Sequence, residues 1–290
     1  MENTPDLKEI IGMLSSKIGF EQRLLEKDYY LTRILHKIAE RKFESLVFKG
    51  GTCLNKCYLG FYRLSEDLDF VYNRDISKFF ANQTRKLFSE LKNMFFDILE
   101  SLNLKINKKL GDGWKMLTAK IPQKFIGLEL IASYASFIDN SEQRVKIEIS
   151  FRKKLIKPTI QKSIKHEFYN ELNEPILLEG IKIECINLKE NLAEKFRALI
   201  TRKTIASRDL FDIYYILKNK LVEVDNELVE LIISKINEAK TFTKQELINF
   251  IEHLSKEIVN EKELKTLTRT NEDVDAETII NLIKRDFKSS

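Results

Sequence analysis

The hydrophobic pattern of this 290-residue chain changes once, near residue 186. Before that point, helical stretches are mixed with short segments in which apolar and polar residues alternate, and such alternation is typical of strands. After it, apolar residues recur every three or four positions, which predicts helices at 188–203, 208–219, 225–238, 244–259 and 275–286. We therefore expect an α+β fold, with an α/β domain over residues 1–186 and a helical domain over 187–290 that completes a shared cleft.

The first part of the chain is predicted to alternate between the two kinds of element. The composition favours long regular elements, because only 9 Gly and 4 Pro occur. Gly60 is expected to end its helix as a left-handed cap. The predicted helices cover residues 21–41, 52–59 and 77–101, and the predicted strands cover 46–48, 67–72, 116–121, 128–134, 145–151 and 181–186.

The composition excludes several classes of protein. Hydrophobic residues at 43% and charged residues at 32% describe a globular chain, and a net charge of +5 is too small to predict nucleic-acid binding by itself. The first residues carry no apolar run after a basic start, so they do not resemble a secretory signal. No run of 18 apolar residues occurs, so we expect no membrane span and a cytoplasmic location.

The cysteines do not predict a disulfide framework, because there are three of them. Cys53 and Cys57 stand four residues apart, but no cluster of Cys or His completes a zinc site around them, and the histidines at 36, 166 and 253 lie elsewhere in the chain. We expect the cysteines to be small buried side chains in a reducing cytosol.

A glycine turn, Lys49-Gly50-Gly51-Thr52, separates a predicted strand from a predicted helix. Glycine lets an anion approach the backbone closely, and the start of a helix presents N–H groups and a positive dipole end to it. The turn therefore favours phosphate binding. An ordinary tight turn remains the alternative.

Two aspartates follow 15 residues after Thr52, within Ser65-Glu66-Asp67-Leu68-Asp69-Phe70. In a strand, residues two apart point the same way, so Asp67 and Asp69 present neighbouring carboxylates. Their mutual repulsion is relieved by a hard divalent cation, Mg²⁺ or Mn²⁺, which also takes substrate phosphates as ligands. Two solvated aspartates on an edge strand are the alternative.

A third carboxylate would complete a two-metal site, and Glu148 is the candidate. It lies in the alternating segment 144–151, opposite in face to Val145, Ile147 and Ile149. A charged residue on the wet face of a sheet is the alternative interpretation.

The helical part supplies further candidates. Lys195 lies on the same helix stripe as Leu188, Leu192 and Leu199, where an ammonium group needs an anionic partner: a triphosphate, or a carboxylate of the core. Ser207 is predicted to cap the next helix, with Asp209 in its first turn. Two further carboxylates stand among apolar neighbours: Asp212, which could orient Lys195 or the nucleotide, and Asp28, expected to partner a buried donor.

These motifs resemble a known family. Gly50-Gly51-Thr52 followed by Ser65-Glu66-Asp67-Leu68-Asp69 resembles the signature of the DNA polymerase β-type nucleotidyltransferases. Over residues 20–218 the chain is more narrowly similar to the AbiEii/AbiGii-type toxins of type IV toxin–antitoxin systems. The segments that carry this likeness are Glu26-Lys27-Asp28-Tyr29, Phe48-Lys49-Gly50-Gly51-Thr52, Glu194-Lys195 and Arg208-Asp209-Leu210-Phe211-Asp212.

The resemblance implies a nucleotidyltransferase-type mixed sheet flanked by helices, with a helical domain after it. It also implies transfer of a nucleotide from an NTP to an acceptor, in some members the 3′ end of tRNA, to arrest growth or abort phage infection until an antitoxin protein intervenes. The chain has Gly51-Thr52 where many members have Gly-Ser, and Glu148 where a third Asp is usual. The implied nucleotide-binding residues are Lys49, Gly50, Gly51, Thr52, Ser65, Lys195, Arg208 and Asp209, and the implied catalytic residues are Asp67, Asp69, Glu148, Lys195 and Asp212.

A basic stretch follows the strand that bears Glu148. Such a stretch attracts an RNA backbone, but it could equally dock an acidic antitoxin or be a solvated face. Two other functions stay open: an enzyme of the same fold with a small-molecule or protein acceptor, and a nucleotide-binding regulator without transferase activity. The basic residues are Arg144, Lys146, Arg152, Lys153, Lys154, Lys157, Lys162 and Lys165.

Overall fold

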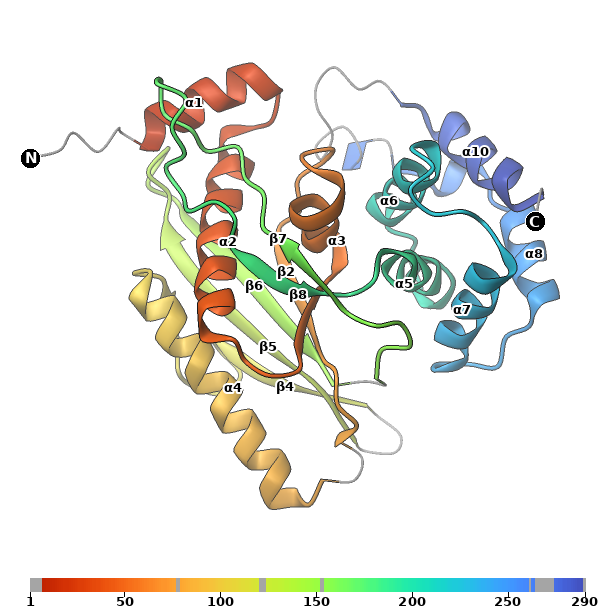
Figure 1. Cartoon of the computed structure of the whole chain (residues 1–290), viewed down its shortest axis with the longest axis horizontal. Coiled ribbons are helices and arrows are strands. Elements are labelled where there is room, and N and C mark those ends of the chain that lie inside the picture. Colours follow the sequence, from red (N-terminus) through yellow and green to blue (C-terminus); the bar gives the residue numbers. More distant parts are fainter. Residues whose placement is uncertain are drawn as a thin grey trace, which may run out of the picture. The chain divides into compact units, whose positions relative to one another are not determined.

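The computed structural model describes residues 7–76, 79–119, 124–151, 154–260, 262–263 and 274–288 (Figure 1). The chain divides into two compact units. The sheet unit comprises Met1–Leu155 and Thr159–Cys185, and the helical unit comprises Ile156–Pro158 and Ile186–Ser290. The expectation that the helical part completes a cleft stays a prediction.

In the sheet unit, the described residues form an eight-stranded mixed sheet, which confirms the predicted α+β class. The strand order is β3-β5-β6-β2-β1-β8-β7, with β4 paired to β5 outside this path. Two pairs are parallel, β2 with β6 and β1 with β8, and the others are antiparallel. The strands are β1 (Leu46–Lys49), β2 (Asp67–Tyr72), β3 (Lys105–Ile106), β4 (Trp114–Ala119), β5 (Lys124–Ala135), β6 (Glu142–Ser150), β7 (Ile160–Ser163) and β8 (Lys182–Cys185).

Helices cover one face of this sheet. The helices α2 (Gln22–Arg41) and α4 (Ala81–Ser101) lie side by side over it (Figure 1). Phe70 of β2 packs against this layer, with its ring centroid 6.0 Å from that of Phe95 on α4. Because side chains alternate along a strand, Asp67 and Asp69 point to the face opposite Phe70.

The structure differs from the expected elements in five places. Helix α1 (Leu7–Ile18) and the strands β3 and β7 were not predicted, and the last two are too short to show alternation. The helix expected at 52–59 starts earlier, as α3 (Gly50–Cys53), and continues as a π-helix over Leu54–Leu59. Gly60 has φ 73° and ψ −166°, so it is extended at positive φ and is not the predicted left-handed cap.

In the helical unit, the predicted helices are present with shifted ends. The segment expected as one helix over 244–259 is broken, because α8 ends at Glu252 and a short 3₁₀ turn covers Lys256–Ile258. No helix within the described ranges is long and apolar enough to cross a membrane. The helices are α5 (Leu188–Thr201), α6 (Ser207–Lys218), α7 (Asn226–Asn237), α8 (Lys244–Glu252) and α10 (Ala276–Lys288).

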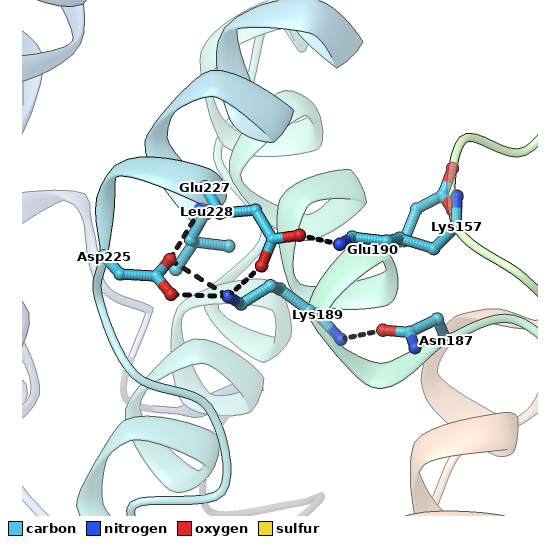
Figure 2. A network of polar contacts seen from close by, with 7 residues as sticks. All are labelled: Lys157, Asn187, Lys189, Glu190, Asp225, Glu227 and Leu228. Carbon is cyan, nitrogen blue, oxygen red and sulfur yellow. Dashed lines mark hydrogen bonds and ion pairs between the residues drawn. The ribbon is translucent and has the colours of Figure 1, made fainter.

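A polar network joins α5 to α7 on the surface of this unit (Figure 2). The Lys189 ammonium donates to the Asp225 carboxylate at 2.7 Å and to Glu227 at 2.6 Å. Asn187 caps α5 by accepting from the backbone N–H of Lys189. Lys157, from the short segment Ile156–Pro158, also pairs with Glu227. The network fixes that segment to the helical unit.

Candidate functional site

The glycine turn and the paired aspartates meet on the sheet. Gly50 follows β1 directly and has φ +78°, a backbone conformation that residues other than glycine rarely adopt. A Cβ atom at Gly50 would lie 2.4 Å from Oδ2 of Asp69, so the Asp69 carboxylate rests against the bare backbone of the turn. The register explains this approach, because Lys49 pairs with Asp69 across β1 and β2.

The second glycine is packed against a side chain that the sequence did not single out. A Cβ atom at Gly51 would lie 2.6 Å from a terminal nitrogen of Arg63 and 3.1 Å from Oγ of Ser65. Arg63 is 2% exposed and donates to the carbonyl of Leu64 at 2.8 Å. A lone arginine between Tyr62 and Leu64 carries no motif, so only the fold shows that its guanidinium lies against the turn.

Thr52 connects the turn to the acidic strand. Its hydroxyl donates to the backbone carbonyl of Asp67 at 2.5 Å, and the residue is 1% exposed. This bond holds the turn in register with the strand. In this structure Thr52 therefore positions Asp67, while its predicted contact with phosphate stays a prediction.

A row of charged side chains crosses five neighbouring strands on this face. Directly paired residues project to the same side of a sheet, and the register brings two lysines and three carboxylates into line. Glu129, which the sequence interpretation missed, is one of them, although it alternates with Leu128 and Leu130 as a strand residue should. In strand order β1, β2, β6, β5 and β4, the row is Lys49, Asp69, Glu148, Glu129 and Lys115.

Lys146 shows how negative this face is. It pairs with Asp67 in the register, and its ammonium lies 3.3 Å from the Glu148 carboxylate and 3.7 Å from Glu129. Burial alone would lower the pKa of Lys146, but the charges of Glu148, Asp67 and Glu129 outweigh burial and raise that pKa. The site therefore favours positive charge.

The donor set fits a divalent cation. Asp67, Asp69 and Glu148 offer carboxylate oxygens from adjacent strands, and oxygen is the ligand that Mg²⁺ and Mn²⁺ prefer. Their oxygens are not gathered as tightly as the three sulfur atoms described below, so an ion shared by all three requires side-chain rotation toward it. Gly50 brings the backbone of the turn directly against Asp69, where a Cβ atom would collide with the carboxylate.

In the helical unit, Lys195 has two acidic partners. Its ammonium lies 2.9 Å from Asp209 and 2.7 Å from Asp212, and both carboxylates are buried. Arg202 also pairs with Asp209. The ion pair with core carboxylates, which was the alternative to a phosphate contact, is thus present.

The comparisons with known proteins give the chain a family. A family model described as the nucleotidyl transferase AbiEii toxin of type IV toxin–antitoxin systems matches residues 33–285. The chain belongs to the AbiEii family. Nothing among the curated proteins matches it.

A solved structure agrees with the fold of this AbiEii chain. A crystal structure of a candidate nucleotidyltransferase from H. pylori has a TM-score of 0.53 at 17% identity, and the match covers 93% of this chain and 95% of that chain. JHP933 from Helicobacter pylori matches with the same identity and coverage at a TM-score of 0.48. At this identity the likeness concerns the fold, whereas the family match shows that the chain is a nucleotidyltransferase.

One expectation for the AbiEii motifs changes in the structure. Ser207 does not cap α6, because Ala206 is the residue before the helix and the Ser207 hydroxyl instead accepts from the N–H of Asn260 at 2.6 Å. Asp209 lies in the first turn of α6, as predicted, and its carboxylate is buried against Lys195. Arg208 is exposed on the same helix.

The motif residue Asp28 has the role predicted for it. Its carboxylate pairs with the ammonium of Lys56 at 2.5 Å, and both side chains are fully buried. Burial raises the pKa of Asp28, while the charge of Lys56 opposes that shift. The pair joins α2 to the π-helix that follows the glycine turn.

The basic stretch is divided by the fold. Arg144 and Lys146 lie on β6, Lys162 lies on β7, and Lys157 belongs to the helical unit. Arg152 and Lys153 lie outside the described residues. The basic residues of this stretch are therefore divided between the two units.

Proposed function

We propose that the charged face of the sheet unit binds an NTP with Mg²⁺ or Mn²⁺ and transfers its nucleotide to the 3′ end of a tRNA. The observation that carries this proposal is the contact of Asp69 with Gly50, which brings the carboxylate pair against the bare backbone of the glycine turn. The family supports nucleotidyl transfer. The tRNA acceptor and the divalent metal ion go beyond the family match and belong to our proposal.

Each part of the site has a task in this scheme. The backbone N–H groups of the turn and the ammonium of Lys49 hold the triphosphate, and Ser65 lines the turn beside Gly51. Asp67, Asp69 and Glu148 hold the divalent ion, which when bound neutralises phosphate charge. Glu148 or Asp69 takes the proton of the acceptor hydroxyl as its oxygen attacks the α-phosphorus. The bond from that phosphorus to the β-phosphate oxygen breaks, and pyrophosphate leaves.

We assign the helical unit a supporting part in the same reaction. Lys195 would contribute positive charge toward the phosphates, held in position by Asp212 and Asp209. Arg208 is an exposed fork-shaped donor for a phosphate. Arresting growth by modifying tRNA, restraint by an antitoxin, a role in phage defence and a cytoplasmic location are included in the proposal, because the family is a toxin family of type IV systems.

Labelled NTPs, Mg²⁺ and total tRNA test the transfer directly. We expect label to enter tRNA with the wild-type protein and transfer to fall about 100-fold or more in Asp67→Asn, because a carboxylate that holds the ion is lost. Asp97→Asn is the matched control, since Asp97 is an exposed aspartate on α4 and should keep wild-type transfer. Removing the divalent ion with a chelator should also abolish transfer.

The result that would reject the transfer reaction is an absence of label in any RNA, together with equal growth arrest by Asp67→Asn and wild type. Label on a protein or a small molecule would reject the tRNA acceptor alone. Sequencing RNA ends from cells that express the protein identifies the acceptor and the added nucleotide. Lys195→Ala should reduce transfer; unchanged transfer would remove Lys195 from the scheme.

A further inference from the structure

Three cysteine side chains converge in the sheet unit, although the sequence indicated no such cluster. Cys53 is the last residue of α3, Cys57 lies one turn further in the π-helix, and Cys185 is the last residue of β8. Their sulfur atoms all lie within 4.8 Å of one another, and each side chain is at most 4% exposed. Within the described ranges, no other group of three His, Cys, Asp or Glu side chains is gathered so closely.

The topology explains the meeting of residues so far apart in the chain. Strand β8 pairs with β1 in parallel, and Cys185 is the register partner of Phe48. Strand β1 continues through Gly50 into α3, so Cys53 returns to the neighbourhood of β8. Cys57 follows four residues later on the same helix side. The third sulfur is thus supplied by tertiary structure.

Sulfur donors in this number select a particular class of ion. Thiolates bind soft d¹⁰ cations such as Zn²⁺ and Cu⁺, and they discriminate against the hard ions that carboxylates prefer. Three thiolates around Zn²⁺ leave one negative charge in a buried place, and such a charge needs a nearby cation. Lys162 on β7 is a nearby cation: its ammonium lies 5.0 Å from the ring centroid of Tyr58, the residue after Cys57, and its charge acts on the Cys57 thiol.

We propose that Cys53, Cys57 and Cys185 form a binding site for one soft d¹⁰ cation, Zn²⁺ or Cu⁺. The thiol of Cys185, which donates to the carbonyl of Ile183 at 3.6 Å, gives up that weak bond on binding. The bound ion ties α3 and the π-helix to β8 and so braces the segment that begins at Gly50. The site is separate from the proposed carboxylate site, and its occupancy does not depend on the proposed reaction.

The test uses the full chain, purified with a thiol reductant and a chelator in the absence of oxygen. Zn²⁺ and Cu⁺ are titrated in separate arms, each against a chromophoric competitor, and Cd²⁺ is added as a spectroscopic probe. We expect one equivalent of ion per chain, a thiolate-to-Cd²⁺ charge-transfer band, and a higher Tm with the ion than without it. Zn²⁺ favours four ligands, so stronger binding of Cu⁺ would indicate a three-sulfur site.

Serine variants assign the ligands. Cys53→Ser, Cys57→Ser and Cys185→Ser should each weaken binding at least about 10-fold to 100-fold, because removal of a ligand costs no less than loss of its supporting contacts. Ile183→Val is the packing control, since it trims a buried side chain of the same strand and keeps every sulfur. Asp67→Asn should bind the soft ion normally, which separates this site from the proposed transferase site.

Slower reaction of the wild-type thiols with a thiol reagent when the ion is present supports the site without any substitution. The proposal is overturned if the reduced wild-type protein holds no equivalent of either ion. It is also overturned if all three serine variants, folded by circular dichroism, keep wild-type affinity. Failure of tRNA labelling would leave these results unchanged.

Discussion

Gly50 and Gly60 both have a positive φ but differ in their surroundings. Both have positive φ, +78° and +73°, but a Cβ at Gly50 meets Asp69 whereas a Cβ at Gly60 has nothing within 4 Å. Alanine at either position should cost about 1–3 kcal/mol, because a residue with a Cβ is strained at positive φ. We expect Gly50→Ala to cost more than Gly60→Ala and also to abolish transfer, because the Asp69 carboxylate must move. Urea unfolding and the labelling assay measure both effects; equal losses in the two variants would contradict this geometry.

His36 is predicted to make stability depend on pH. The residue is 5% exposed, and burial, with the nearby charges of His166 and Lys56, lowers its pKa from 6.5 to about 4. The folded protein thus resists protonation that the unfolded chain accepts, so stability is full above pH 6.5 and falls as the pH drops toward 4. At 1.36 kcal/mol per pKa unit, the free energy of unfolding should fall by about 3 kcal/mol over this pH range.

Replacing the imidazole checks this dependence. Urea unfolding of His36→Phe across the same pH range should show a smaller loss of stability than the wild type. His253→Gln, which changes an exposed histidine in the helical unit, should follow the wild type. Parallel pH profiles of His36→Phe and wild type would show that His36 does not titrate as expected.

The sequence predicted the residues that stand in motifs and missed those that only the register brings together. Asp67 and Asp69 were identified as a pair because residues two apart in a strand project to the same face of the sheet. Glu129 and Arg63 were missed, because no local pattern says which strand lies beside which, or which side chain folds under a turn.

At the scale of elements, the buried Lys235 holds α7 to α5. Its side chain is 1% exposed, and its ammonium lies 2.5 Å from Glu190 and 3.2 Å from Glu194. Burial by itself would lower the pKa of Lys235, but the charges of Glu194 and Glu190 outweigh burial and raise that pKa. Glu190 also accepts hydrogen bonds from the backbone N–H groups of Ile156 and Lys157, so one carboxylate joins three segments.

Lys235→Met should therefore destabilise the helical unit strongly. The expected cost is about 3–5 kcal/mol, because the substitution leaves buried carboxylates without their cation. Lys189→Met is the matched control on the same pair of helices. Its partners Asp225 and Glu227 are about half exposed to solvent, so the loss of Lys189 should cost under about 1 kcal/mol. Urea unfolding compares the two variants, and similar costs would show that the buried pair is no stronger than the surface network in Figure 2.

The elements with strong periodicity were mostly predicted well, whereas helix α1 and the short strands β3 and β7 were missed. Helices α2 and α4 and the strands around Asp67 and Glu148 carry enough apolar positions to show their period. Strands β3 and β7 have two and four residues, too few for a pattern. The sequence also did not predict the π-helix at Leu54–Leu59, because its apolar residues fit an α-helix equally well.

At the scale of the whole molecule, the chain does not pass once from one unit to the other. After β6 it contributes Ile156–Pro158 to the helical unit, returns for β7 and β8, and enters the helical unit again at Ile186. The sequence indicated a single change of hydrophobic pattern near residue 186, because a segment of three residues is too short to show a period of its own. Backbone hydrogen bonds to Glu190 determine where that short segment belongs.

The sequence by itself determined the class of fold, the glycine turn, the acidic strand and the family resemblance that the family match confirms. These features are local, since a turn, a strand face and a motif lie within a few adjacent residues. Only the tertiary structure decided that Asp69 rests on Gly50, that Glu129 joins the charged row, and that Cys185 meets Cys53 and Cys57. Strand order and register brought those groups together, and they depend on packing between segments far apart in the chain.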